Sequence, residues 1–204
     1  MARVGIFGGT FNPPHFGHLL CVSEAIGALG LDRALLVPVF IPPHKQVTGD
    51  PGPEVRLELC RLAVADDDRI GLSDLEVQRA GTSYTVDTLR TLDANSPEDD
   101  LTLIVGGDVA QGLPSWKEPD EVLRLARLAV AEREGVRRAD VLERVSSLKG
   151  SAGRIEFFDM PRLDLSSSLI RRRVAGGRSI RYLVPEAVAQ AIERRGLYSD
   201  VGSQ

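Results

Sequence analysis

Cysteines, aromatic residues and long apolar runs are all scarce in this chain of 204 residues. Its two cysteines, Cys21 and Cys60, form no Cys-x-x-Cys pair and are too few for a disulfide framework. Both lie in segments with helical periodicity, where cysteine is expected to be a small buried hydrophobe. No apolar run approaches the about 20 residues that cross a bilayer, and the N-terminus runs too directly into the first motif for a secretory leader. We therefore expect a protein of the reducing cytoplasm that has no membrane partner.

The common nucleotide-binding motifs are also missing. The sequence has no G-x-x-x-x-G-K-[ST] loop, and no G-x-G-x-x-G follows the first apolar segment. Its net charge of −4 argues against binding to nucleic acid. Arginines are nevertheless concentrated in "IRRRVAGGRSIR", residues 170–181. This segment is either a solvated helix face or a site for a polyanion smaller than DNA.

Apolar runs alternate with amphipathic segments along most of the chain, and this alternation predicts an α/β fold. The predicted strands are 3–7, 33–40, 69–79, 100–108, 128–134 and 154–160. The predicted helices are 17–29, 54–66, 83–95, 118–127, 138–150, 166–177 and 185–198. Residues 1–160 should form a doubly wound, Rossmann-like domain with a mostly parallel sheet, whose ligands bind beyond the carboxyl ends of the strands. Residues 161–204 should form a small helical subdomain packed on this core.

The segment "GGTFNPPHFGHLL", residues 8–20, combines three glycines, two prolines and two of the three histidines. It lies where a predicted strand ends and a predicted helix begins, and this position favours anion binding. His15 and His18 are three residues apart, so one helical turn can direct both at a single phosphate. Zinc would need a third ligand, which is not evident near this pair. A histidine alone in this position could also be a helix cap or a surface residue.

This segment resembles the signature of the H-x-G-H nucleotidyltransferase superfamily. Four later blocks, together with the first, resemble the nicotinate-nucleotide adenylyltransferase family and extend the similarity over residues 4–198. These blocks are "VPVFIPPHK", "SYTVDTL", "GGDVAQGLPSWK" and "LSSSLIRRRVAGGRSIRYLVPEAVAQAIERRGLY". The family more often has aspartate at the position of Asn12 and often has threonine at the position of Ser168.

The resemblance implies adenylyl transfer from ATP to nicotinate mononucleotide, which gives deamido-NAD and pyrophosphate in NAD biosynthesis. The phosphate of the acceptor is already ionised near pH 7, so it can attack directly and in line, without a covalent intermediate. The protein would then act by positioning and charge neutralisation. Mg²⁺ is expected to arrive with ATP, because no carboxylate cluster marks a protein cage for it. The oligomeric state, a homo-oligomer included, is left open.

The residues that the resemblance assigns fall into three overlapping groups. The catalytic group is His15, His18, Lys45 and Arg171. The ATP-binding group is Gly8, Gly9, Thr10, Phe11, His15, Gly17, His18, Ser167, Ser168 and Arg171. The acceptor-binding group is Lys45, Tyr84, Thr85, Gly107, Asp108 and Trp116. His18 would stabilise the pentavalent phosphorus, and Arg171 would hold the β- and γ-phosphates.

On the acceptor side, Lys45 would bind the phosphate and Trp116 would stack on the pyridine ring. Backbone N–H groups near Thr85 would receive the nicotinate carboxylate at a helix start. Asp108 would accept hydrogen bonds from ribose hydroxyls or cap a helix. Trp116 could also be a core residue, the serines could be simple helix caps, and the role of His44 stays open.

Three alternatives use the same residues. The acceptor could be phosphopantetheine or glycerol phosphate, although the blocks that contain Thr85 and Trp116 count against this. A tRNA synthetase is disfavoured because the chain is short and lacks a K-M-S-K-S pattern. A nucleotide sensor without turnover could lose His18 or Arg171, and both are present.

Overall fold

The computed structural model describes residues 1–43, 49–132 and 137–199, and its strands form one six-stranded parallel sheet. The strands are β1 (Arg3–Gly9), β2 (Arg33–Pro38), β3 (Ile70–Leu72), β4 (Asp100–Gly106), β5 (Arg127–Glu132) and β6 (Ile155–Asp159). Their order in the sheet is β3-β2-β1-β4-β5-β6. The direction of winding therefore reverses between β1 and β4, where such folds bind ligands. The predicted doubly wound fold is confirmed.

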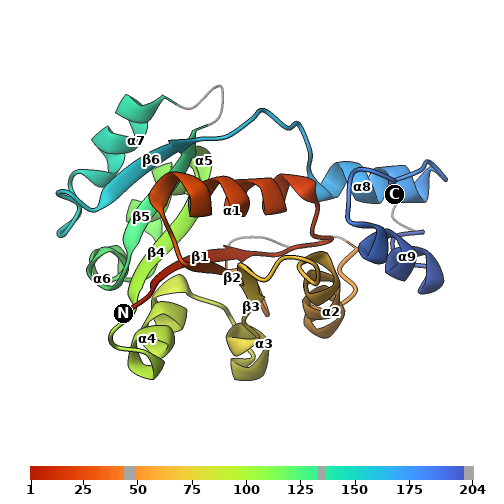
Figure 1. Cartoon of the computed structure of the whole chain (residues 1–204), viewed down its shortest axis with the longest axis horizontal. Coiled ribbons are helices and arrows are strands. Elements are labelled where there is room, and N and C mark those ends of the chain that lie inside the picture. Colours follow the sequence, from red (N-terminus) through yellow and green to blue (C-terminus); the bar gives the residue numbers. More distant parts are fainter. Residues whose placement is uncertain (44–48, 133–136, 200–204) are drawn as a thin grey trace.

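Helices cover both faces of this sheet, with α1 along one face and α4 on the other (Figure 1). The helices are α1 (Phe16–Leu29), α2 (Pro53–Ala63), α3 (Leu75–Arg79), α4 (Thr85–Asn95), α5 (Gly107–Gln111), the 3₁₀ helix η1 (Leu113–Ser115), α6 (Pro119–Leu125), α7 (Arg138–Val145), α8 (Ser167–Ala175) and α9 (Glu186–Arg194). Alternate residues of β4 enter two different cores: Leu103 packs with α4 and Ile104 with α1. Burial on both faces explains the continuous apolar runs of the strands.

The predicted strand at 69–79 is wrong beyond its first residues. β3 ends at Leu72, and the chain then forms the short helix α3. The Ser73 N–H still donates to the Leu36 carbonyl, but the Gln78 N–H donates to the Asp74 carbonyl, which is a helical bond. The alternating pattern was misleading because both Glu76 and its neighbour Val77 are buried.

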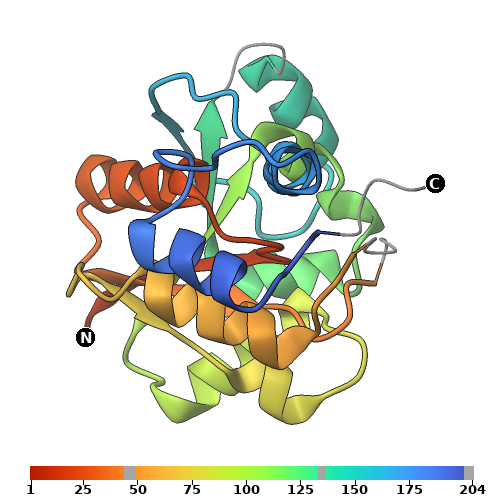
Figure 2. The same ribbon diagram turned by 90° about the vertical axis from the view of Figure 1, so that its right-hand side faces the viewer.

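The C-terminal segment packs on α2 through a separate apolar cluster. Leu59 of α2 lies in this cluster with Ile170 of α8 and with Val188 and Ile192 of α9. Figure 2 shows α9 lying beside α2. The segment that we expected to form a helical subdomain therefore packs on the α/β domain.

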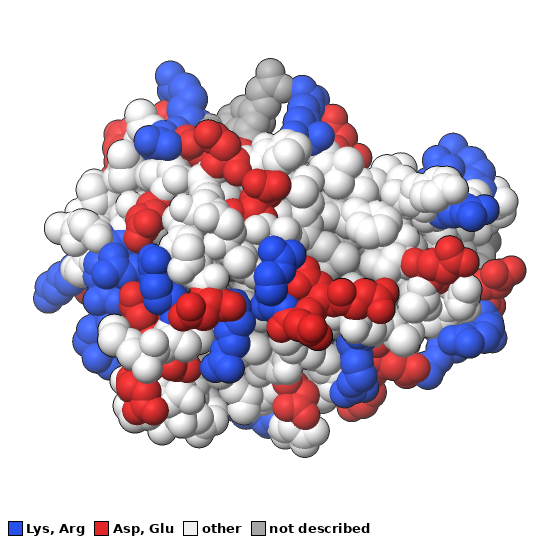
Figure 3. Space-filling model, in the orientation of Figure 1, with Lys and Arg blue, Asp and Glu red and all other residues white. Residues whose placement is uncertain are grey.

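Both cysteines are buried in the described structure, as predicted. Cys21 packs in the core beneath α1, and burial raises the pKa of the Cys60 thiol well above its usual range. Positive and negative side chains are interspersed on the face shown in Figure 3. Within the described residues, none of the helices is both long and apolar enough to cross a membrane.

Candidate functional site

The loop after β1 lies at the carboxyl end of the sheet and borders a cavity of about 360 Å³. A volume of this size is in the range of small-ligand pockets, about 300–1,000 Å³. Its lining joins six residues that the sequence placed in two different binding groups: Gly8, Gly9, Thr10, Tyr84, Thr85 and Trp116. The structure thus brings the β1 loop and the start of α4 to one cavity.

The two histidines of this loop lie against each other. Their rings stack with centroids 3.6 Å apart, and the backbone N–H of His15 donates to Nδ1 of His18 (3.2 Å). Because Nδ1 accepts this bond, the neutral imidazole of His18 has its proton on Nε2. His15 is the N-cap of α1 and is only 4% exposed, whereas His18 is half-buried. The expected pairing of the histidines on one turn is therefore present, with His18 the more accessible ring.

Gly17 and Phe11 hold the histidine rings in place. A Cβ at Gly17 would lie 3.0 Å from Nδ1 of His15, so a larger residue would require this ring to shift from its place against the helix. Phe11 is buried and meets the His18 ring edge-on, with centroids 5.0 Å apart. The expected contribution of Phe11 to ATP binding would therefore be support of His18. The Phe16 N–H donates to the Leu183 carbonyl (3.1 Å), so α1 offers fewer open N–H donors than we expected.

Helix α8 brings Arg171 to the same loop. The guanidinium donates from Nη1 to the Asn12 carbonyl (2.7 Å) and from Nη2 to Ser168 Oγ (3.2 Å). Ser167 Oγ donates to the Pro13 carbonyl (2.8 Å). The helix cap is Ser166, whose hydroxyl accepts from the Leu169 N–H, so capping explains neither of the two predicted serines. Ser167 therefore connects α8 to the loop, and Ser168 helps to hold Arg171.

Sequence reasoning missed Arg56, which is completely buried on α2. Its Nη1 donates to the carbonyls of Thr10 (2.9 Å) and Val39 (2.7 Å), and its Nη2 donates to the Phe40 carbonyl (2.9 Å). Its Nε donates to Asp50 (2.9 Å). One guanidinium therefore links the β1 loop, the end of β2 and the segment before α2. An arginine within an amphipathic helix gives no sequence signal for such a role.

Sequence reasoning also missed Tyr198, which holds the side chain of Asn12, the position at which the family more often has aspartate. Its hydroxyl donates to Asn12 Oδ1 (2.7 Å), and Asn12 is only 2% exposed. Burial raises the pKa of the Tyr198 phenol well above its usual range, so this group stays a neutral donor. The C-terminal end of the described chain thereby holds the β1 loop.

The start of α4 forms the other side of the cavity. The N–H groups of Thr85 and Val86 have no hydrogen-bond partner among the described residues, as is usual for a first helical turn. Trp116 packs against the core and also lines the cavity, so contact with the core does not remove it from the cavity wall. Lys117 lies over the Tyr84 ring, with Nζ 4.8 Å from its centroid, and pairs with Asp87 (2.9 Å).

Among the acceptor-binding residues that the structure describes, Gly107 and Asp108 do not line this cavity. Gly107 and Asp108 form the first turn of α5 behind the N-cap Gly106, so Asp108 does not cap the helix. Asp108 is exposed at the end of β4. Lys45 and its neighbour His44 lie outside the described residues.

A buried carboxyl lies at the α4 side of the cavity. Glu76 of α3 is 5% exposed, and its Oε1 accepts a hydrogen bond from Thr88 Oγ1 of α4 (2.6 Å). Burial raises the pKa of Glu76, and the hydroxyls of Thr88 and Ser83 and the charge of Arg79 oppose this shift. The failed strand prediction at 69–79 hid this residue.

Comparisons with known proteins agree with the family resemblance and with the fold. A family model described as cytidylyltransferase-like matches residues 6–173. A protein of Shouchella clausii named "Probable nicotinate-nucleotide adenylyltransferase" is 40% identical over 200 residues, which cover 98% of each chain. A protein of the same name from Geobacillus thermodenitrificans is 42% identical and covers 97% of this chain and 87% of its own. The Plasmodium falciparum nicotinic acid mononucleotide adenylyltransferase complexed with NaAD shares the fold, with a TM-score of 0.78, 18% identity and 98% of both chains covered.

Proposed function

The chain belongs to the cytidylyltransferase-like family and, within it, to the nicotinate-nucleotide adenylyltransferases, and we propose that it transfers the adenylyl group of ATP to nicotinate mononucleotide. The products are deamido-NAD and pyrophosphate. One observation carries the proposal. The loop after β1 borders a cavity that Trp116 also lines, and the same loop leads into the stacked His15 and His18. The chemistry and the acceptor pocket therefore share one loop. We place this reaction in the reducing cytoplasm, which suits the two buried cysteines.

The ATP phosphates would bind along the β1 loop, between the histidines and α8. The Nε2–H of His18 would donate to the α-phosphate, where charge builds up as the acceptor oxygen attacks in line and pyrophosphate leaves. Arg171 would neutralise the β- and γ-phosphates, because Asn12 and Ser168 hold its guanidinium beside this loop. Glycine at positions 8 and 9 would let the backbone approach the phosphates closely.

The acceptor would occupy the cavity. Trp116 would stack on the pyridine ring, and the open N–H groups of Thr85 and Val86 would receive its carboxylate. Lys45 would bind the acceptor phosphate and Asp108 the ribose hydroxyls, as the family resemblance implies. No protein nucleophile is needed, because the attacking group is a phosphate oxygen of the acceptor.

Magnesium would enter with ATP and would supply charge neutralisation at the phosphates. Over residues 1–43, 49–132 and 137–199, no group of three histidine, cysteine or acidic side chains could hold a metal ion. The ion would therefore be held mainly by phosphate oxygens and water, which is a common arrangement for Mg²⁺.

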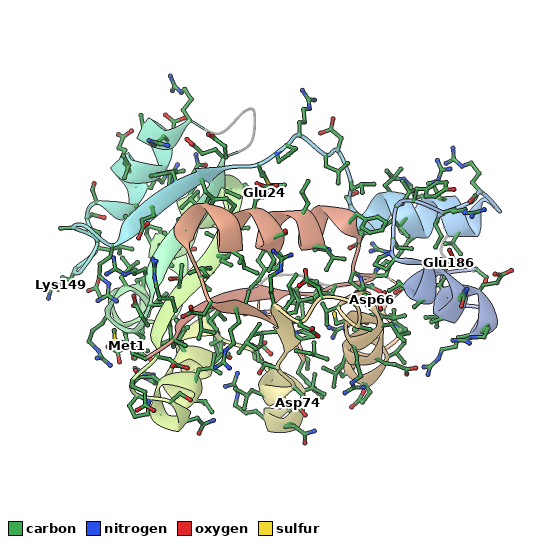
Figure 4. All side chains as sticks on the ribbon, viewed as in Figure 1. Met1, Glu24, Asp66, Asp74, Lys149 and Glu186 are labelled. Carbon is green, nitrogen blue, oxygen red and sulfur yellow. The ribbon has the colours of Figure 1, made fainter. Side chains whose placement is uncertain are left out.

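The test is product formation by the purified protein. With ATP, Mg²⁺ and nicotinate mononucleotide, we expect deamido-NAD and pyrophosphate in equal amounts. His18→Ala should lower the rate by roughly 10²–10³, the usual effect of removing a transition-state donor. Glu24→Gln is the matched control, because Glu24 lies on the same helix, α1, away from the loop (Figure 4). Equal turnover of wild type and His18→Ala would refute the role of His18, and pyrophosphate release without deamido-NAD would refute the acceptor.

A further inference from the structure

Only one of the two oxygens of the Glu76 carboxyl has a hydrogen-bond partner in the described structure. Oε1 accepts the bond from Thr88, but Oε2 is buried and has no hydrogen-bond partner among the described residues. An ionised carboxylate with an unsatisfied buried oxygen is costly, so such a group needs an explanation. Glu76 also lines the cavity in which we place the pyridine ring.

The position of this carboxyl matters because of the helix that it contacts. Thr88 belongs to α4, one turn after Thr85, which also lines the cavity. The positive end of α4 attracts an anion, and a negative charge on Glu76 would oppose that attraction. A neutral Glu76 would leave the positive end uncompensated while still accepting the hydrogen bond from Thr88.

Other charges around this contact are balanced or shared. Arg79, also on α3, donates to Thr88 Oγ1 (3.0 Å) and is the charged neighbour of Glu76. Asp87 of α4 is paired with Lys117, which follows η1. Arg56 of α2 is bound to backbone carbonyls and to Asp50. Among these charged groups, only Glu76 has a buried polar atom without a hydrogen-bond partner in the described structure.

We infer that Glu76 is a specificity-determining residue: its protonation state sets the preference of the cavity for an anionic over a neutral substituent on the pyridine ring. The inference rests on the proposed function and adds to it a residue that acts through the field at the start of α4, without touching the substrate. The protonated form favours the acid substrate, and the ionised form weakens its binding by like-charge repulsion. Burial supports a titration above the usual glutamate range, because it raises the pKa of Glu76.

The experiment compares kcat/KM for nicotinate mononucleotide with kcat/KM for its amide from pH 5.5 to 8.5. The ratio of the two cancels the titration of the shared phosphate, of ATP and of the histidines. For the wild type we expect the acid-to-amide ratio to fall about tenfold as pH rises, the effect of one pKa unit of interaction. In Glu76→Gln, which keeps a neutral acceptor for Thr88, the ratio should stay at its low-pH value throughout.

Asp74→Asn is the matched control, because it removes a carboxylate of the same turn that is exposed to solvent (Figure 4). Its ratio should follow the wild-type profile. A flat ratio in the wild type would overturn the inference, and so would an equal fall in Glu76→Gln. The wild-type profile alone decides the matter if Glu76→Gln does not fold. Absence of deamido-NAD at every pH would instead refute the proposed function.

Discussion

Removal of the Arg56 guanidinium should destabilise the protein and disturb the β1 loop together. The side chain is completely buried and donates to the carbonyls of Thr10, Val39 and Phe40, as well as to Asp50. Arg56→Met keeps a long apolar side chain in the same space but leaves four acceptors without their donor. The substitution therefore tests the hydrogen bonds more than the packing.

The expected loss can be estimated from the partners. Removing one partner of a buried charged pair costs about 3–5 kcal/mol. Thr10, Val39 and Phe40 are only half-buried, so water can reach some of the carbonyl groups that lose their donor. We therefore expect the lower end, about 3 kcal/mol, and with a urea m-value of about 2 kcal/mol/M this lowers the unfolding midpoint by about 1.5 M. Arg56→Lys should lie between Arg56→Met and the wild type, because one ammonium cannot reach four acceptors.

The assay is urea unfolding, with Arg69→Met as the control. Arg69 makes a comparable pair with Asp67 (2.8 Å), but it is largely exposed, so its loss should leave the unfolding midpoint close to that of the wild type. Arg56→Met should also raise KM for ATP, because Thr10 loses its anchor. A midpoint within 0.3 M of wild type, about 0.6 kcal/mol at this m-value, would refute the reasoning.

Three further substitutions probe other parts of the site. Trp116→Ala should raise KM for nicotinate mononucleotide about tenfold and leave KM for ATP unchanged, because base–aromatic stacking is worth about 1–3 kcal/mol; steady-state kinetics with each substrate varied would show it, and equal changes would contradict stacking. Tyr198→Phe should cost about 1–2 kcal/mol in urea unfolding, because it leaves the buried Asn12 Oδ1 unpaired; no loss would contradict this. Burial raises the pKa of Glu76, so its ionisation opposes folding as pH rises. Glu76→Gln should therefore gain stability relative to wild type at pH 8 but not at pH 4, and the reverse order would contradict the sign.

The sequence was a good guide where the relevant signal is local. The alternation of apolar runs predicted six strands in parallel order, and the spacing of His15 and His18 predicted that one turn brings them together. Segment 69–79 was mispredicted because Leu75 and Val77 alternate with polar residues, as in a half-buried strand, whereas the structure buries Glu76 together with Val77 in a short helix. The helix and strand propensities of these residues do not reveal that the segment contacts α4 through Glu76 and Thr88.

The rest of the site depends on contacts between distant parts of the chain. Arg56 lies 46 residues from Thr10, and Tyr198 lies 186 residues from Asn12. No spacing rule connects such positions, and their residue types are common on surfaces. The cap at Ser166 was missed for a local reason, since three consecutive serines offer equally good caps.

Competition between the acid and the amide mononucleotides tests the central claim most directly. Both acceptors would be offered to the protein at equal concentration with ATP and Mg²⁺ at pH 7.5, and the two dinucleotide products would be separated and quantified. We predict that deamido-NAD predominates, because the open N–H groups at the start of α4 favour a carboxylate over an amide. Predominance of the amide product, or equal amounts of the two, would contradict the account.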